Sequence, residues 1–221
     1  NCTSLVTAPT FENVTTVGED GFTTCFYNCT SLVTAPTFEN VTTVGEDGFT
    51  TCFYNCTSLV TAPTFENVTT VGGNSFAGCF SGCTSLVTAP TFENVISFGG
   101  RNNFESCFYN CTSLVTPPTF ENLTSVQIGS FDSCFRNCTA LVTSPKFDKV
   151  TEGVYNSFKY CFKGCTSLET ITAPSPSSWT SSHFTDWVDG VPSTGTFYKK
   201  AGLTIPSGTS GIPEGWTVVE V

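Results

Sequence analysis

Several residue types are missing or scarce in this chain of 221 residues, and each absence narrows what the protein can be. The chain contains no Met and a single His, and residues 1–100 contain no Lys or Arg. All eight basic residues follow residue 100, and the formal net charge is −10. Because nucleic-acid binding depends on Lys and Arg that neutralise phosphates, we expect no nucleic-acid partner.

Long hydrophobic runs are also missing. No stretch approaches the roughly 20 consecutive apolar residues that cross a bilayer, so we expect no membrane span in this chain. Since the chain begins at Asn1 and has no Met, we expect it to be a portion of a longer protein, whose secretion signal would lie upstream. Only 12% of the residues are charged, whereas Phe numbers 21 and Cys 13, which is too aromatic a composition for a disordered chain.

The residues that are present form a repeat. The string "NCTSLVTAPTFENVTTVGEDGFTTCFY" occupies residues 1–27 and recurs without change at 28–54. One cysteine series opens successive units at spacings of 27, 27, 27, 28, 27 and 27: Cys2, Cys29, Cys56, Cys83, Cys111, Cys138 and Cys165. A second series precedes the last six of these by four residues: Cys25, Cys52, Cys79, Cys107, Cys134 and Cys161. Six full repeats therefore end near residue 164, and a partial seventh begins at Cys165.

Two patterns alternate within each unit. The Phe and Cys residues of "GFTTCFYNCTSL" (21–32) are spaced at i, i+3, i+4 and i+7, which predicts one face of a short helix or 3₁₀ turn. The segment "LVTAPTFENVTTVG" (32–45) is rich in β-branched residues and is broken by Pro36. It therefore predicts two short extended pieces with a corner between them, and Gly45 suits the turn that follows.

A coil of about 27 residues cannot bury its own hydrophobic face, so the repeats predict a solenoid of right-handed β/3₁₀-helix coils with a continuous core. Strands pack about 4.7–4.9 Å apart and helices about 8–10 Å apart, which predicts a right-handed superhelical stack with the strands on the concave side, although 3₁₀ segments would flatten it. We expect the solenoid to span residues 1–174. We expect 175–221 to be a capping segment with short β-strands, in which Trp179, Phe184 and Trp187 cover the last coil. The open face at Asn1 is expected to be continued by further repeats or by another chain.

The pattern "F..CF.NCTSL" followed by "P.F.NVT.VG" resembles the BspA-like, or Treponema-type, leucine-rich repeats, and the resemblance covers residues 1–174. These units are a few residues longer than usual and double the cysteine. The resemblance implies a bacterial surface protein that adheres to host proteins or to other cells. The tail "STGTFYKKAGLTIPSGTSGIPEGWTVVEV" (193–221) is similar to the endings of repeat proteins from gut Bacteroidetes and their phages.

The paired cysteines admit three interpretations. Structural zinc sites place cysteines two to four residues apart, but the Phe inside each pair and the shared phase favour burial in the core. Disulfides are disfavoured because residues four apart on a helix hold their Cβ atoms about 5–6 Å apart, farther than the roughly 3.5–4.5 Å of a disulfide. We favour two ladders of reduced, buried thiols without a metal or cofactor. A catalytic thiol is excluded because no base lies near any of the pairs in sequence.

Three further features have structural interpretations that we favour over functional ones. The Asn of each "F-E-N" predicts a hydrogen-bonded ladder along the stack: Asn13, Asn40, Asn67, Asn94 and Asn122. The Glu before it predicts a solvated acidic stripe rather than a calcium site: Glu12, Glu39, Glu66, Glu93 and Glu121. The single histidine, His183, precedes Asp186 by three residues, but no nucleophile motif accompanies them, so we expect no enzyme.

Variation among the repeats indicates where a partner could bind. One position tolerates Tyr, Ser, Arg and Lys, which predicts exposure to solvent: Tyr27, Tyr54, Ser81, Tyr109, Arg136 and Lys163. Because Tyr and Arg are favoured in interface hot spots, this row is the predicted recognition face, without Ser81. The alternative is a plain surface row whose chemistry matters only for solubility. We expect a non-enzymatic extracellular module that binds a protein or glycan on host or neighbouring cells. The alternatives are a phage or virion appendage and a passive stalk of a larger protein.

Overall fold

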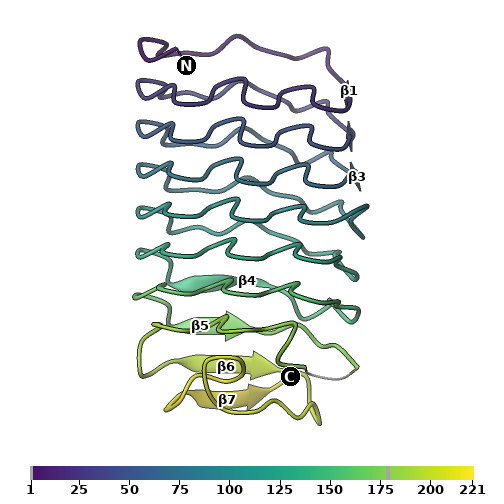
Figure 1. Ribbon diagram of the computed structural model, residues 1–221, viewed down its shortest axis with the longest axis vertical. Helices are drawn as coiled ribbons and strands as arrows, with labels where there is room; N and C mark the ends of the chain where they lie inside the picture. The colour runs from purple at the N-terminus through teal and green to yellow at the C-terminus, as the bar shows by residue number, and fades with distance from the viewer. Residues whose placement is uncertain (1, 178–179) are drawn as a thin grey trace.

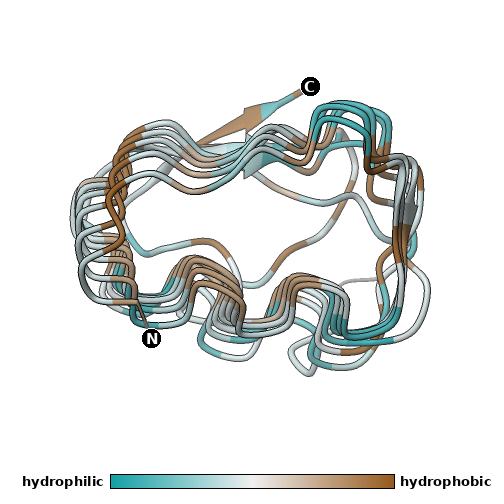
Figure 2. Ribbon diagram, turned by 90° about the horizontal axis from the view of Figure 1, so that it is seen from above, coloured by the Kyte–Doolittle hydropathy of each residue, from teal (hydrophilic) through white to brown (hydrophobic). Residues whose placement is uncertain are grey.

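Successive coils of the chain lie one above another in a straight column (Figure 1). The structure is a computed structural model that describes residues 2–177 and 180–221. Seen along the column, the coils superpose as one flattened loop (Figure 2). The predicted repeat solenoid is thereby confirmed.

Seven short strands form two parallel sheets along the stack. The first sheet has the order β1 (Thr16–Val17), β2 (Thr43–Val44) and β3 (Thr70–Val71), and the second has the order β4 (Thr143–Lys146), β5 (Thr170–Thr172), β6 (Thr196–Lys199) and β7 (Thr217–Glu220). Equivalent residues of neighbouring coils pair in register, as in Val17 with Val44. Single bridges occupy the position of the second sheet in the earlier coils, from Thr7 through Thr34, Thr61 and Thr88 to Thr116. Others continue the first sheet, from Ser97 through Ser125 to Glu152. Each coil is therefore joined to the next by backbone hydrogen bonds.

The segment expected to be helical is instead a run of tight turns, and no helix occurs in residues 2–177 or 180–221. In the first coil every fourth residue has a positive φ of 56°: Asp20, Thr24 and Asn28. Alternate N–H groups close turns within the coil, as Cys25 N does to Phe22 O at 3.2 Å. The others donate to the next coil, as Phe26 N does to Cys52 O at 2.8 Å. A turn repeated every four residues produces the i, i+3, i+4, i+7 spacing as well as a helix does, so the spacing could not distinguish the two.

The predicted curvature of the stack was wrong for the same reason. Helices would hold neighbouring coils farther apart than strands do, but the turn segments hydrogen-bond directly to one another across the coils. The distance between neighbouring coils is therefore similar on the strand side and on the turn side. The rings of Phe26 and Phe53, for example, stack with centroids 5.2 Å apart. Equal spacing on both sides gives the straight column of Figure 1.

Phenylalanine columns fill the interior of the stack. One column, from Phe26 to Phe162, stacks ring on ring at 5.2–5.5 Å. Two further columns, which begin at Phe11 and Phe22, meet edge to face, as Phe38 and Phe49 do at 4.8 Å. Offset-stacked and edge-to-face pairs are the arrangements that aromatic rings prefer. The core therefore runs through the coils without interruption.

The coil path continues beyond residue 174. Strands β6 and β7 extend the second sheet, and the turn segment of the last coil is formed by "SSHFTDWVDG" (181–190), which contains no cysteine. Phe184 stacks on Phe158 at 5.4 Å, and Trp187 is fully buried with its indole N–H donating to Gly211 O at 2.8 Å. Trp179 lies outside the described residues. The predicted division of the chain at 174/175 stays a prediction.

The described residues contain no helix of the length and apolar character that a membrane crossing needs.

Candidate functional site

We call the outer side of the turn segments the turn face; it spans residues 20–28 and their equivalents in later coils. The predicted recognition residues lie on it, one per coil, and all five are half-buried: Tyr27, Tyr54, Tyr109, Arg136 and Lys163. Ser81, which the same pattern placed in solvent, is only 5% exposed. The row therefore consists of large side chains on either side of one small, covered residue.

Tyr27 and Tyr54 form a stacked pair at the start of this row. Their centroids lie 4.9 Å apart and their planes differ by 5°. The stack follows from the backbone, because Asn28 N donates to Tyr54 O at 2.8 Å and so fixes the register of the two coils. The stack therefore covers one face of each ring.

Arg136 lies between two aromatic rings farther along the turn face. Its Cζ is 5.8 Å from the Tyr109 centroid and 5.7 Å from the Tyr160 centroid, which are cation–π distances. Its Nε is buried and has no hydrogen-bond partner among the described residues. Tyr160 was not predicted, although the signal was present in the sequence. The equivalent positions in earlier coils carry only small residues: Thr24, Thr51, Gly78, Ser106 and Ser133.

Charged side chains gather on the same part of the turn face. Lys163 Nζ lies 2.8 Å from the Asp189 carboxylate, and Lys159 Nζ lies 3.8 Å from that of Asp132. The two ammonium groups also lie over the Tyr160 ring, that of Lys159 at 4.8 Å and that of Lys163 at 5.1 Å from its centroid. Burial raises the pKa of the Asp132 carboxyl, and burial together with the nearby Asp132 raises that of Glu105. The sequence prediction included only Lys163 from this cluster, because its partners lie in other coils.

The predicted cysteine ladder lies in the core, except at the start of the chain. Cys25 is exposed, whereas the remaining eleven ladder residues are buried: Cys29, Cys52, Cys56, Cys79, Cys83, Cys107, Cys111, Cys134, Cys138, Cys161 and Cys165. From Cys56 on, the thiol of the second cysteine in each pair donates a hydrogen bond to a Phe carbonyl of the preceding coil. Cys56 Sγ, for instance, lies 3.1 Å from Phe26 O. The thiol thus fills a small apolar space and also satisfies a buried acceptor.

Burial makes these thiols poor nucleophiles. It raises the pKa of Cys56 and of Cys165 to about 12, and it raises those of the fully buried Cys79 and Cys134 strongly. In residues 2–177 and 180–221, no three His, Cys, Asp or Glu side chains are grouped so that they could hold a metal ion. The chemistry at these positions is therefore packing and hydrogen bonding.

The repeated Asn side chains link the coils, although not to one another as predicted. Asn40, Asn67, Asn94 and Asn122 each donate through Nδ2 to the backbone carbonyl of the Glu in the preceding coil, at 2.7–2.8 Å. The Glu side chains of this row are exposed. The row therefore contributes structure through its amides and an acidic edge through its carboxylates.

His183 and Asp186 are not arranged as a catalytic pair. The Asp186 carboxylate accepts a hydrogen bond from Thr209 Oγ1 at 2.8 Å. His183 Nδ1 is buried and has no hydrogen-bond partner among the described residues, and burial lowers the pKa of the ring. Among the described residues, no hydrogen bond joins His183 to Asp186, which is the contact that orients a catalytic histidine.

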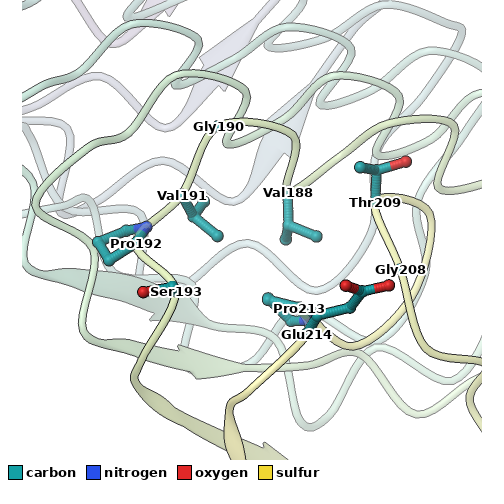
Figure 3. A pocket seen from close by; sticks show the side chains of 9 residues that line it. All are labelled: Val188, Gly190, Val191, Pro192, Ser193, Gly208, Thr209, Pro213 and Glu214. Atoms are coloured by element: carbon teal, nitrogen blue, oxygen red, sulfur yellow. The ribbon is translucent and has the colours of Figure 1, made fainter.

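A cavity of about 360 Å³ lies in the C-terminal segment, next to the end of the turn face. Its lining combines the apolar side chains of Val188, Val191, Pro192 and Pro213 with the polar ones of Ser193, Thr209 and Glu214 (Figure 3). Glu214 is its only ionisable lining residue, and this side chain extends toward Gly208 and Thr209 (Figure 3). A single carboxylate provides no second ionisable group for an acid–base pair in this cavity.

Comparison with known proteins identifies the repeat. The family model described as "BspA type Leucine rich repeat region" matches six copies, over residues 1–100 and 23–186. No curated protein matches the chain.

Among solved structures, a leucine-rich repeat protein of T. pallidum is 18% identical, with 86% of this chain and 77% of that chain covered and a TM-score of 0.39. A leucine-rich cell surface protein of Faecalibacterium prausnitzii is 19% identical, with 93% and 76% covered and a TM-score of 0.30. A leucine-rich repeat protein of Bacteroides ovatus is 17% identical, with 89% and 79% covered and a TM-score of 0.22. All three TM-scores are low, so the assignment depends on the family model alone.

Proposed function

The chain belongs to the family of BspA-type leucine-rich repeat proteins, and we propose that it is a non-enzymatic module that binds partner proteins at the bacterial cell surface. The partners would be proteins of host or neighbouring cells. One observation carries the proposal. From coil to coil the buried Phe and Cys positions barely change, whereas the outer positions of the turn face change in size and charge. Outer positions elsewhere change less often, as at Ile96 and Lys149. Variation concentrated on one outer face is typical of a repeat scaffold that displays a binding surface.

The side chains of this face suit protein recognition. Tyr and Arg dominate interface hot spots because they bury a large area at a small cost in conformational entropy. The stack of Tyr27 on Tyr54 already restricts both rings, so less freedom is lost when a partner binds. The Tyr109 and Tyr160 rings flank the Arg136 guanidinium. Because the rings cover the faces of the guanidinium, a partner carboxylate would approach its edge and form two parallel hydrogen bonds there.

The length of the row agrees with an ordinary interface. Six coils at about 4.8 Å span roughly 24 Å from the first member to the last. A standard protein interface buries about 800 Å² on each partner, and a row of this length with its neighbouring positions can supply that area.

The experiment compares binding of labelled variants to cultured epithelial cells and to immobilised matrix proteins. A variant with Tyr27→Ala, Tyr54→Ala and Tyr109→Ala should bind at least about tenfold more weakly than the parent chain, since hot-spot residues contribute 2 kcal/mol or more, as an order of magnitude. The matched control carries Val33→Ala, Val60→Ala and Val115→Ala, three exposed side chains outside the turn face. The control should bind like the parent chain. Equal binding by the parent chain and the tyrosine variant would refute the proposal.

A passive stalk is the second candidate, and the two identical opening repeats favour it, because a spacer needs no variation between coils. It predicts that the parent chain, taken alone, binds neither cells nor matrix. The same experiment therefore separates the two functions.

A further inference from the structure

A depression of about 640 Å³ lies at the corner that precedes the turn face, across the second to fifth coils. Glycine backbone forms its floor, including Gly73 and Gly100. Glu46, Arg101 and Gln127 are the polar side chains that line it. Its volume is within the range of about 300–1,000 Å³ that is typical of ligand sites.

The depression coincides with the only change in repeat length, the spacing of 28 between Cys83 and Cys111. Hydrogen bonds identify the inserted residue. Gly73 O accepts from Asp47 N at 2.9 Å, and Arg101 O accepts from Asn74 N at 2.7 Å, so Arg101 is the equivalent of Gly73 one coil on. Gly100 is therefore the additional residue, and it adopts a φ of +64°. A one-residue bulge re-aims the side chain beside it, here the first cationic residue of the chain.

Packing does not explain why residue 73 is a glycine. A Cβ on Gly45 or Gly72 would approach backbone atoms of the preceding coil to 2.9 and 2.7 Å, so those two glycines are required by the close approach of the coils. A Cβ on Gly73 would meet only atoms at 3.6–3.7 Å, which is ordinary contact. The first two coils carry Glu at the equivalent position. The fold would therefore accept a side chain at residue 73, and its absence leaves the depression open.

The lining residues define the chemistry of a ligand. The nearest heavy atoms to a Cβ on Gly73 include Glu46 Oε1 at 3.7 Å, so this carboxylate lies over the glycine floor. The ion pairs found among the described residues involve neither Glu46 nor Arg101. A carboxylate only accepts hydrogen bonds and a guanidinium only donates them, whereas the Gln127 amide does both. Neighbouring hydroxyl groups of a sugar can satisfy all three.

The other features disfavour ligands of a single charge and favour a sugar ring. An anion would meet Glu46 and the acidic residues of the first two coils, and a cation would meet Arg101. Ile128 is 51% exposed at the edge of the depression and offers an apolar contact for the C–H face of a ring. The glycine floor lets a ring approach the backbone closely. We propose that this depression binds a neutral oligosaccharide of hexose units, as a site separate from the turn face.

The probes are biotinylated neutral tetrasaccharides of glucose, mannose, galactose or N-acetylglucosamine, with a uronic-acid tetrasaccharide and an unrelated tetrapeptide as contrasts. Titration into the ¹⁵N-labelled chain should shift the amide resonances of Gly73, Gly99 and Gly100 with at least one neutral probe. Gly73→Gln, which fills the depression without adding charge, should weaken that binding at least about tenfold. Gly73→Ala is the matched control and should retain the affinity within about threefold, because its Cβ makes ordinary contacts.

Should Gly73→Gln fail to fold, Arg101→Ala and Glu46→Gln decide the matter, because both side chains are exposed. Each should weaken binding about five- to tenfold through the loss of hydrogen bonds. Binding of none of the neutral probes, a preference for the acidic probe or the peptide, or full binding by these variants would each overturn the proposal. The tyrosine variant of the turn face should bind the probe normally, so failure of one site is distinguishable from failure of the other.

Discussion

The first two coils and the fifth and sixth coils have the same interior but different exteriors. Phe26 and Phe53 stack at 5.2 Å, and Phe135 and Phe162 stack at 5.5 Å. On the outside, we compare the residue that follows the first Phe of each turn segment. It is Thr23 and Thr50 in the two early coils but Asp132 and Lys159 in the later ones. Packing and coil-to-coil hydrogen bonds thus determine the interior, while the exterior can change without disturbing them.

The first prediction concerns the cysteine ladders, which should make both regions sensitive to alkali. Burial raises the thiol pKa of Cys56 and Cys165 to about 12, whereas an unfolded Cys has a pKa of about 8.5. The folded state therefore retains protons that the unfolded state loses as pH rises. Stability is fully present below about pH 8.5 and is lost as pH rises toward about 12.

The loss should be about 1.4 kcal/mol per pH unit for each thiol, as an order of magnitude, and several thiols act together. Urea unfolding followed by circular dichroism at rising pH measures it. Cys56→Ser in the early region and Cys165→Ser in the late one should each reduce the pH dependence by a similar amount. A free energy of unfolding that does not change above pH 9 would show that the thiols are oxidised or hydrated. Iodoacetamide at neutral pH should label Cys25, which is exposed, before any buried member.

The second prediction tests whether the two interiors are energetically equivalent. Phe53→Ala and Phe135→Ala each remove a fully buried ring from the same column. Each should reduce the free energy of unfolding by about 3–5 kcal/mol through lost burial and the remaining cavity. Urea unfolding of the two variants measures the losses. If one loss is less than half the other, the interiors are not equivalent, and the simple nearest-neighbour picture of the stack fails.

The same contrast explains what could be predicted from the sequence. The inward positions recur in every coil, so the period, the core residues and the solenoid followed from the spacing of Cys and Phe alone. The turn conformation did not, because a four-residue turn and a helix place Phe22, Cys25 and Phe26 on the same face. The straightness of the stack depends on that conformation and was missed with it.

The candidate sites were only partly predictable for a related reason. Variation along one position predicted Tyr27 and Arg136 as binding residues, but Tyr160, whose ring flanks Arg136, is the only Tyr at its position in the repeats. Contacts such as that of Lys163 with Asp189 join residues of different coils, and their sequence separation has no fixed pattern. The depression at Gly73 exists because this position lacks the side chain that the first two coils carry as Glu. The spacing of the repeated residues gives no sign of such a depression.

The third prediction has the smallest expected effect and concerns the charged exterior of the later coils. Lys163 and Asp189 form an ion pair at 2.8 Å, with 31% and 42% of their side-chain surfaces exposed. Solvent and salt screen a pair this exposed, so Asp189→Asn should lower the free energy of unfolding by no more than about 1 kcal/mol. The loss should shrink as salt is raised from about 0.05 to 1 M, since the Debye length falls to about 3 Å. The control is Thr23→Ala in the first coil, which removes no charge and should show no such salt dependence. A loss of more than about 2 kcal/mol that is insensitive to salt would mean that Asp189 acts through packing, and that the later exterior is part of the structural core.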